Sequence, residues 1–257
     1  MDKVQLDKYL ERINFRNKIC NNLDTLSALQ KSHLLNIPFE NLDIHHKIPI
    51  SINLEYFYNK IVENKRGGFC YELNGLFNEL LKSLGFKTHL VSARVFNAQE
   101  KYGDEFDHLA IIVKIDNDNW IVDVGFGEFA FSPLKIITGI EQKDERGIFR
   151  IISFNKDYLA VQKKSSDGWK NEYLFSLRPR NISEFSDKCN YHQSSPDSTF
   201  TQKKLCSIAT LNGRITLTDK SLKITSNDTV REIEIVNDKR FYQLLKIYFD
   251  IEFKADI

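Results

Sequence analysis

The spacing of apolar residues changes near Gly85 in this 257-residue chain, and that change constrains the fold. Before Gly85 apolar residues recur every three or four positions, which is the spacing of one face of an amphipathic helix. After Gly85 they fall in short runs separated by Asp, Asn and Gly, which is typical of strands joined by turns. The sequence therefore predicts a helical N-terminal third followed by a β-rich region.

Four stretches before Gly85 have helical spacing, and the last begins at Cys70. Gly85 lies where a glycine that ends this helix is expected. Ser51 or Asn53 is a candidate N-cap for the third stretch. The apolar residues that define the four stretches are Leu6, Tyr9, Leu10 and Ile13; Leu23, Leu26, Leu29 and Leu34; Leu54, Phe57, Tyr58, Ile61 and Val62; and Leu73, Leu76, Phe77, Leu80, Leu81 and Leu84.

The β-rich region predicts a run of antiparallel strands, which is typical of a barrel or a sandwich. A tight turn is expected at 116–118, and Asn212-Gly213 predicts a hairpin because both residues tolerate positive φ. Asp238 is a candidate cap for a final helix whose apolar face holds Phe241, Leu244, Leu245 and Tyr248. The expected strands are residues 86–96, 108–115, 119–126, 148–154, 158–164, 169–177, 203–211, 214–218, 222–225 and 230–236.

Charge and cysteine usage narrow the class of protein. Lys+Arg is 36 and Asp+Glu 35, a formal net charge of +1 that gives no reason to expect nucleic acid or an anionic membrane as a partner. No apolar run reaches the roughly 20 residues of a membrane helix, and no signal-peptide core is visible at the N-terminus. The four cysteines are scattered without a CxxC pair, so we expect a reducing cytoplasm and no metal site.

Cys70 is the first candidate for chemistry because of where it lies. It follows Gly67-Gly68-Phe69 and opens an amphipathic helix, so its thiol meets unpaired N–H groups and the positive end of the helix dipole. Those groups favour the thiolate, which is the nucleophilic form. The alternative is an inert buried thiol, which is what most free cysteines are.

His108 and Asp123 are the second and third candidates. His108 begins an apolar strand, and Asp123 lies inside another apolar run, where an ionised carboxylate is costly without a partner. If these two strands form a hairpin around residues 116–119, the two side chains come close together. A thiol, an imidazole that takes its proton and a carboxylate that orients the imidazole form the arrangement used in nucleophilic catalysis. The alternative is three unrelated buried polar residues.

Several segments resemble the arylamine N-acetyltransferases. Residues 66–74 read RGGFCYELN and resemble the nucleophile motif of that family, and residues 38–42, PFENL, resemble its N-terminal motif. His108 and the segment DVGFG at 123–127 match its histidine and aspartate segments in the same chain order. Residues 169–179, 195–200 and 210–217 resemble the family's later segments, so the likeness runs from Tyr9 to about Leu222.

The resemblance implies an α+β fold with three parts. These are an N-terminal helical bundle that carries the nucleophile (1–85), a central antiparallel β-barrel that carries the histidine and aspartate (86–190), and a C-terminal α/β lid (191–257). It also implies a Cys-His-Asp triad resembling that of cysteine proteases, and a ping-pong reaction. In that reaction Cys70 takes an acetyl group from acetyl-CoA and passes it to an arylamine, arylhydroxylamine or arylhydrazine.

The resemblance also implies ligand contacts. Phe39, Val95 and Phe126 match positions near the acceptor pocket, although ordinary core residues are an equal alternative because pockets and cores use the same side chains. A second set, Gly125, Gly127 and Thr210, matches segments near bound CoA. Turn geometry is an equally good reason for the two glycines.

Two other functions remain open on the sequence. A cysteine hydrolase or a transglutaminase-like enzyme uses the same triad, although the RGGFC and PFENL segments argue against both. A non-catalytic binding module that retains the fold is the other alternative, and its usual mark, loss of a triad residue, is not seen here.

Overall fold

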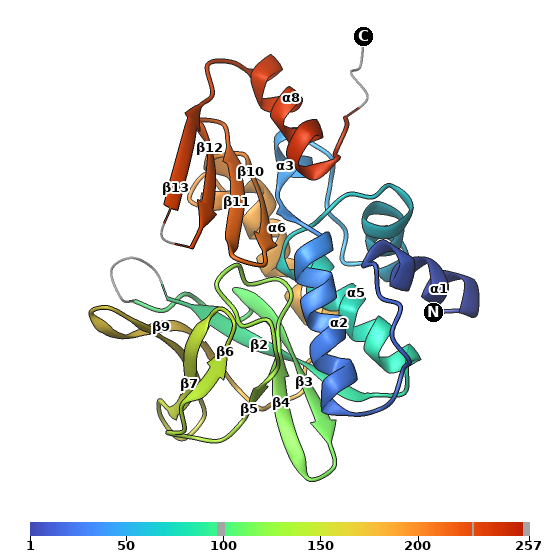
Figure 1. Cartoon of the computed structure of the whole chain (residues 1–257), viewed down its shortest axis with the longest axis vertical. Coiled ribbons are helices and arrows are strands. Elements are labelled where there is room, and N and C mark those ends of the chain that lie inside the picture. The colour runs from blue at the N-terminus through green and yellow to red at the C-terminus, as the bar shows by residue number, and fades with distance from the viewer. Residues whose placement is uncertain (97–100, 228, 254–257) are drawn as a thin grey trace.

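The computed structural model describes residues 1–96, 101–227 and 229–253, which form a helical part, a large antiparallel sheet and a smaller sheet (Figure 1). The helical part contains the four predicted helical stretches, the third of which ends in a π-helical turn. Its elements are α1 (Lys3–Arg12), α2 (Leu23–Asn36), α3 (Leu42–His45), α4 (Leu54–Tyr58), the π-helical turn (Asn59–Glu63) and α5 (Cys70–Ser83).

The two helix caps expected in this part are present. The Asn53 side chain accepts hydrogen bonds from the N–H groups of Glu55 and Tyr56, and so caps α4. After α5, Gly85 has φ of +89°, and the N–H of Phe86 donates to the carbonyl of Leu81 at 3.0 Å, a bond that spans five residues and closes the helix end. A glycine adopts this left-handed conformation without the steric cost that a Cβ imposes.

The large sheet has eight strands in the order β5-β4-β3-β2-β9-β8-β7-β6, and it curls into a nearly closed barrel. Gln142 joins the two edge strands, because its side chain accepts from the N–H of Lys135 at 2.7 Å and donates to the carbonyl of Lys135 at 2.9 Å. The predicted barrel is therefore confirmed. The strands are β2 (Lys87–Val95), β3 (His108–Ile115), β4 (Asp118–Val122), β5 (Leu134–Lys135), β6 (Gln142–Asp144), β7 (Gly147–Ser153), β8 (Leu159–Ser165) and β9 (Gly168–Phe175).

One predicted strand is too long. The strand expected over 119–126 is β4, which ends at Val122. The cause is the Asp123 side chain, whose Oδ1 accepts the N–H groups of Gly125 at 2.9 Å and Phe126 at 3.0 Å and so folds the chain into a turn. The short strands β5 and β6 have too few residues to show a period, and the sequence did not predict them.

The small sheet has five strands in the order β1-β10-β11-β12-β13, and its first strand comes from the N-terminal part of the chain. Phe39 pairs with Ser207, and Glu40 pairs with Cys206. Helix α8 covers one face of this sheet. The elements are β1 (Phe39–Glu40), β10 (Leu205–Thr210), β11 (Gly213–Thr218), β12 (Ser221–Ser226), β13 (Thr229–Glu234) and α8 (Asp238–Phe249).

The hairpin predicted at Asn212-Gly213 is present, but its turn lies one residue earlier. Thr210 pairs with Gly213, so the turn residues are Leu211 and Asn212, and neither Asn212 nor Gly213 has positive φ. A Cβ on Gly213 would lie 2.1 Å from the carbonyl oxygen of Thr225, so close strand packing requires this glycine. The expected cap of the last helix is wrong by one residue, because Asn237 accepts the N–H of Arg240.

A short helical segment that the sequence did not predict joins the two sheets. It consists of a 3-10 turn (Ile182–Phe185), α6 (Ser186–Ser194) and α7 (Thr199–Gln202). Its apolar residues are few, so it has little helical periodicity. Phe185 and Cys189 are buried in the core of the helical part, and the Tyr71 ring of α5 lies 5.7 Å from that of Phe185 and 6.2 Å from that of His192 on α6.

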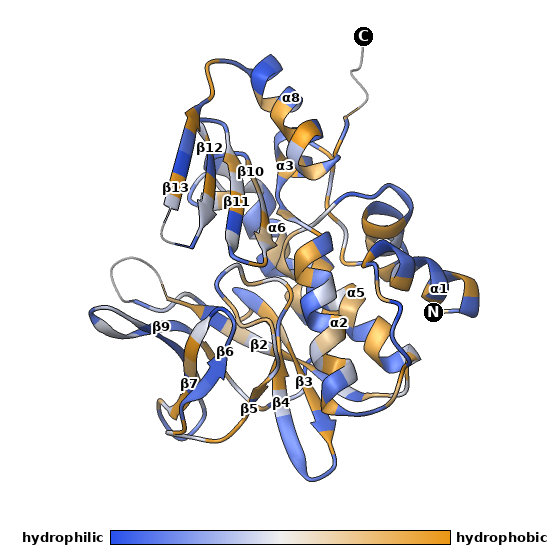
Figure 2. Cartoon of the chain, viewed as in Figure 1, coloured by the Kyte–Doolittle hydropathy of each residue, from blue (hydrophilic) through white to orange (hydrophobic). Residues whose placement is uncertain are grey.

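The largest hydrophobic core lies between α5, α2 and the strands β2 and β3. A second core fills the barrel, and a third lies between α8 and the small sheet. Figure 2 shows hydrophobic stretches along α5, whereas β6 and the tip of the β3–β4 hairpin are hydrophilic. The boundaries expected after residues 85 and 190 stay predictions.

Candidate active site

Cys70, His108 and Asp123 come together at the N-terminus of α5. His108 Nε2 lies 2.6 Å from Asp123 Oδ2, as expected for a hairpin formed by β3 and β4. The Cys70 thiol is close enough to the same imidazole to raise its pKa, and both side chains line one cavity. All three residues are buried, with exposed fractions of 4% for Cys70, 2% for His108 and 0% for Asp123.

The surroundings of the imidazole favour its charged form. Burial lowers the pKa of His108, but the Asp123 carboxylate and the neighbouring Cys70 outweigh it and raise the pKa to about 10. Aromatic rings restrict the imidazole from the barrel side, with ring centroids of Tyr173 at 5.4 Å and Phe126 at 5.6 Å. A fixed imidazolium next to a thiol at a helix N-terminus favours the thiolate.

Asn74 joins α5 to Asp123 and to the strand that carries His108, and it was missed by the sequence reasoning. Its Nδ2 donates to Asp123 Oδ1 at 2.8 Å and to the carbonyl of Leu109 at 2.6 Å, and its Oδ1 accepts the N–H of Val124 at 2.9 Å. Asn74 follows Cys70 by four residues on α5, so the two lie on one face of the helix. That spacing is the signal that could have identified it.

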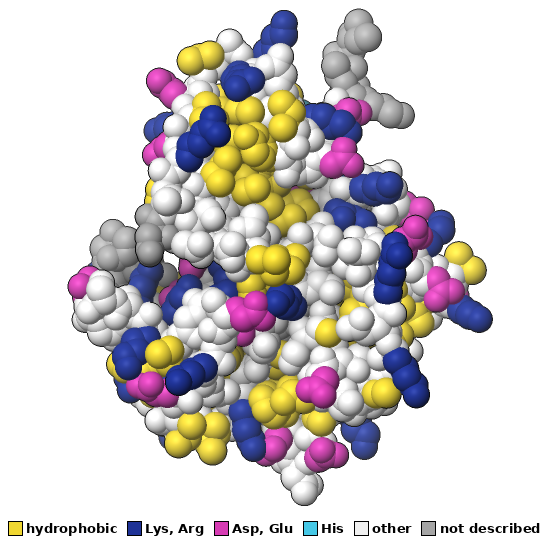
Figure 3. All heavy atoms as spheres, in the orientation of Figure 1, with side chains coloured by type: hydrophobic (Ala, Val, Ile, Leu, Met, Phe, Trp, Pro, Cys, Tyr) yellow, Lys and Arg dark blue, Asp and Glu magenta, His cyan; other side chains and the backbone are white. Residues whose placement is uncertain are grey.

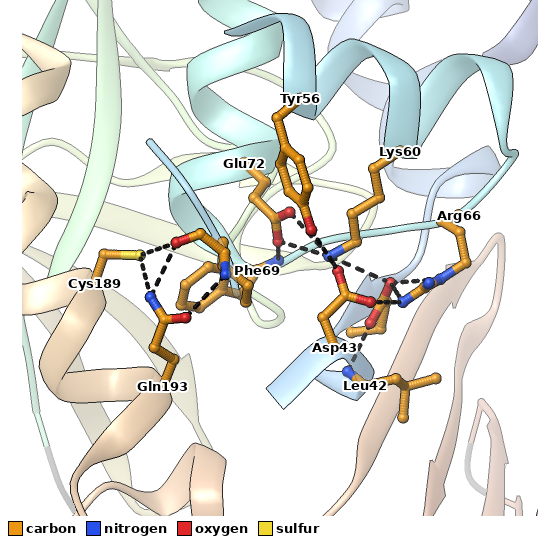
Figure 4. Close-up of polar contacts among 11 residues, drawn as sticks. Leu42, Asp43, Tyr56, Lys60, Arg66, Phe69, Glu72, Cys189 and Gln193 are labelled. Carbon is orange, nitrogen blue, oxygen red and sulfur yellow. Dashed lines mark hydrogen bonds and ion pairs between the residues drawn. The ribbon is translucent and has the colours of Figure 1, made fainter. Parts of the chain in front are cut away.

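A buried ionic cluster lies behind the first turn of α5 (Figure 4). Lys60 Nζ lies 2.9 Å from Glu72 Oε1 and 2.8 Å from Asp43 Oδ2. Glu72 Oε2 accepts the N–H of Phe69 at 2.9 Å, which closes the helix N-terminus. Burial raises the pKa of Glu72 to about 7, although Lys60 opposes the shift.

Arg66 extends this cluster to β1. Its Nη2 lies 2.7 Å from Glu40 Oε1 and 2.7 Å from Asp43 Oδ1, so the PFENL and RGGFC segments are joined by charge-assisted hydrogen bonds. Gly67 allows this approach, because a Cβ there would lie 2.1 Å from the Pro38 carbonyl oxygen. The cluster therefore fixes the turn before Cys70 against the small sheet.

A cavity of about 770 Å³ opens onto Cys70 and His108. Phe39, Val95 and Phe126 line it, together with Phe200 from α7. Gly125 and Gly127 also line it, so five of the six residues expected to contact ligands lie around one space. The sixth, Thr210, lines a neighbouring cavity of about 830 Å³ that shares Glu128, Arg214 and Thr216 with the first.

Gly125 and Gly127 differ in their surroundings, although both line the cavity. A Cβ on Gly125 would lie 2.8 Å from Cys70 Cα and 2.8 Å from Asn74 Nδ2, so packing against α5 already requires a glycine there. A Cβ on Gly127 would meet only the Arg214 guanidinium at 3.6 Å, an ordinary contact. Of these two glycines, Gly127 is the one with space for a Cβ.

The other cysteines lie away from this arrangement. Burial raises the pKa of Cys189 to about 12 and that of Cys206 well above its usual range, whereas Cys20 is exposed. Within residues 1–96, 101–227 and 229–253, no group of three or more His, Cys, Asp or Glu side chains is arranged to hold a metal ion. No described helix has the length and apolar run needed to cross a membrane.

Comparison with known proteins agrees with this geometry. The model of an N-acetyltransferase family matches residues 22–257. The chain is 34% identical to the arylamine N-acetyltransferase pineal gland isozyme NAT-10 of Gallus gallus over 96% of this chain and 94% of that protein. It is 30% identical to arylamine N-acetyltransferase 1 of Homo sapiens over 99% of this chain and 96% of that protein.

Solved structures show the same fold. The arylamine N-acetyltransferase from Salmonella typhimurium superposes with a TM-score of 0.92 at 25% identity, over 100% of this chain and 95% of that one. The corresponding Bacillus cereus enzyme, described as having a unique Cys-His-Glu catalytic triad, gives 0.90 at 27% identity, over 98% of this chain and 100% of that one. This chain has Asp123 beside its histidine. With a family model that covers nearly the whole chain and relatives that match it end to end, the protein belongs to the arylamine N-acetyltransferase family and is an acyltransferase.

Proposed function

We propose that the enzyme transfers the acetyl group of acetyl-CoA to arylamines, arylhydroxylamines and arylhydrazines through an acetyl-cysteine on Cys70. The observation that carries this proposal is the thiol at a helix N-terminus, beside an imidazole that Asp123 holds at 2.6 Å, in the wall of a cavity. The family assignment favours acetyl transfer over a cysteine hydrolase and over a non-catalytic binding module.

The first half-reaction loads the enzyme. The Cys70 thiolate attacks the thioester carbonyl, a bond forms between its sulfur and the acetyl carbon, and the bond to the CoA sulfur breaks. The His108 imidazolium gives its proton to the departing CoA thiolate. Asp123 keeps the imidazole oriented and stabilises its charged form, as the carboxylate of a triad does.

The second half-reaction unloads the enzyme. The free amine attacks the acetyl carbon, neutral His108 accepts the proton that the amine loses, and the Cys70 thiolate leaves. The imidazolium is then restored beside the thiolate, so the cycle closes without another co-reactant. Splitting one acyl transfer into two steps lowers the barrier of each.

The cavity provides for both substrates in turn. The apolar side chains of Phe39, Val95 and Phe126 form the acceptor wall, where an aromatic ring replaces water. On the donor side, we assign the approach of the pantetheine arm to Gly125 and Gly127 and that of the outer part of CoA to Thr210. We place the enzyme in the cytoplasm, where acetyl-CoA is its donor, and assign it no metal.

Intact-mass analysis with acetyl-CoA and no acceptor tests the proposal. One acetyl group should appear on the protein, map to the peptide that bears Cys70 and accompany the release of one CoA. An arylhydrazine should then remove it, and double-reciprocal plots at varied donor and acceptor should be parallel. Intersecting plots, with no CoA released before the acceptor is added, would rule out the covalent route.

A further inference from the structure

A second cavity, of about 830 Å³, lies between the barrel and the ends of the small-sheet strands and adjoins the Cys70 cavity. Figure 3 shows lysine and arginine side chains in the recess between these two parts at the left of the molecule. The cavity is lined by four cationic and two anionic side chains, a formal excess of two positive charges in a chain whose net charge is +1. These are Arg146, Lys163, Arg214 and Lys223, with Glu128 and Glu145.

Two of the cations converge on one neutral atom. Arg146 Nη1 donates to the carbonyl of Gly127 at 2.9 Å, and Arg214 Nη2 donates to the same carbonyl. Arg214 Nη1 donates to Ser207 Oγ at 2.7 Å, and its buried Nε has no hydrogen-bond partner among the described residues. Burial lowers the pKa of Arg214 to about 10, and the charge of Arg146 adds to that shift.

The carboxylates nearby offset the charge of this pair without a direct ion pair to Arg146. Burial lowers the pKa of Arg146, and Glu128, Asp144 and Glu172 oppose that shift from beyond ion-pair distance. Within the described part of the chain, no carboxylate oxygen lies within 4.0 Å of the Arg146 guanidinium. Glu128 is 4.0 Å from Arg214 Nε, but it lies 2.9 Å from Lys163 Nζ. Glu145 forms an ion pair with Lys31, with 2.6 Å between Oε1 and Nζ. Two guanidiniums that share one carbonyl repel each other, and a phosphate group between them would remove the repulsion and fill their free donors.

We propose that Arg146 and Arg214 form a binding site for the phosphate groups of the CoA thioester donor. Arg214 lines both cavities, so a donor whose thioester meets Cys70 in the first can place its phosphates in the second. This inference rests on the proposed function for the identity of the donor. It assigns donor recognition to two side chains that take no part in the acyl transfer itself.

The test compares two donors that share a thioester and differ in their phosphates. Acetyl-CoA carries a diphosphate and a 3′-phosphate, whereas S-acetyl-N-acetylcysteamine carries none. The quantity measured is the ratio of kcat/KM for acetyl-CoA to kcat/KM for the short thioester, in wild type, Arg146→Gln and Arg214→Gln. Arg150→Gln is the matched control, since Arg150 lies on β7, stacks over Trp169 at 4.1 Å and lines neither cavity.

Each arginine variant should lower the ratio by about tenfold or more, as expected when a charge-assisted hydrogen bond is lost. Arg150→Gln should leave it unchanged. In calorimetry, adenosine 3′,5′-bisphosphate should bind the wild type and bind both arginine variants more weakly, while the same concentration of inorganic phosphate competes poorly.

A ratio that stays unchanged in the arginine variants would overturn the proposed site. This includes the case in which kcat/KM falls equally with both donors, which would mean that the arginines only support the turn at Gly127. Binding of the bisphosphate by Arg146→Gln and Arg214→Gln as tightly as by wild type would also overturn it. If wild type accepts acetyl from neither thioester, the proposed function fails, and the calorimetry alone decides the phosphate site.

Discussion

Glu72 Oε2 accepts the N–H of Phe69 at 2.9 Å while its other oxygen lies 2.9 Å from Lys60 Nζ, so one carboxylate both closes the helix that begins at Cys70 and neutralises a buried lysine. Lys60 in turn lies 2.8 Å from Asp43, which Arg66 joins to β1. The position of the nucleophile therefore depends on charges from three separate segments of the chain.

Replacing Lys60 with methionine should lower the free energy of unfolding. Lys60→Met leaves Glu72 and Asp43 buried without their shared cation, and breaking a buried ion pair in this way costs about 3–5 kcal/mol. The free energy of unfolding from urea titration measures the change. Lys8→Met is the matched control, because Lys8 and Glu63 are both exposed and such surface pairs contribute about 0–1 kcal/mol. Equal effects of the two substitutions would contradict the role given to the cluster.

The contact between Cys70, His108 and Asp123 predicts that each is needed for turnover. Cys70→Ser should be nearly inactive because a hydroxyl is a much poorer nucleophile near neutral pH. His108→Gln and Asp123→Asn should each lower kcat by at least about a hundredfold, since general acid–base transfer contributes 10²–10⁴-fold. Circular dichroism establishes that the variants are folded. Near-normal turnover by purified Cys70→Ser would remove the central proposal.

Cys70 should be alkylated by iodoacetamide faster than the other thiols at neutral pH. The imidazolium beside it stabilises the thiolate, whereas burial raises the pKa of Cys189 and Cys206. Cys20 is exposed and serves as the internal control. Peptide mapping after timed alkylation at several pH values gives each rate. His108→Gln should slow the reaction at Cys70 and leave Cys20 unchanged, and the opposite pattern would exclude the ion pair.

The raised pKa of His108 makes stability depend on pH. Folding raises this pKa from 6.5 to about 10. The contribution of protonated His108 to the free energy of unfolding is therefore complete below pH 6.5 and is lost as the pH rises toward 10. Between pH 8 and 10 the free energy of unfolding should fall by up to about 1.4 kcal/mol per pH unit. Glu72 titrates below this window, near 7. His108→Gln should flatten the decline, and a decline as steep in the variant as in wild type would show that other groups cause it.

Gly125 and Gly127 should respond differently to replacement by alanine. A Cβ at Gly125 would lie 2.8 Å from Cys70 Cα, so Gly125→Ala should displace the helix start, lower kcat and destabilise the fold by about 1–3 kcal/mol. Gly127→Ala meets nothing nearer than 3.6 Å and should fold normally. If Gly127 faces the pantetheine arm, its variant should raise KM for acetyl-CoA with little change in kcat. Equal stability losses would show that both glycines are structural.

The sequence by itself determined most of the local secondary structure and the three candidate catalytic residues. The helical spacing before Gly85, the turn around residues 116–118 and the apolar strands were enough to predict α5, the β3–β4 hairpin and the contact of His108 with Asp123. These features depend on residues close together in the chain. Where the local pattern was incomplete, as at Asp123 and Asn212, side-chain hydrogen bonds and strand packing moved the boundaries by a few residues.

Only the tertiary structure decided what lies around the site. The pairing of Phe39 with Ser207, the burial of Lys60 among three carboxylates and the meeting of Arg146 with Arg214 at Gly127 each join segments far apart in the sequence. Apolar periodicity reports which face of an element is buried, but it does not report which distant element covers that face. A buried charge is stable only when its partner arrives from elsewhere in the fold, so such clusters are fixed by packing and by no local pattern.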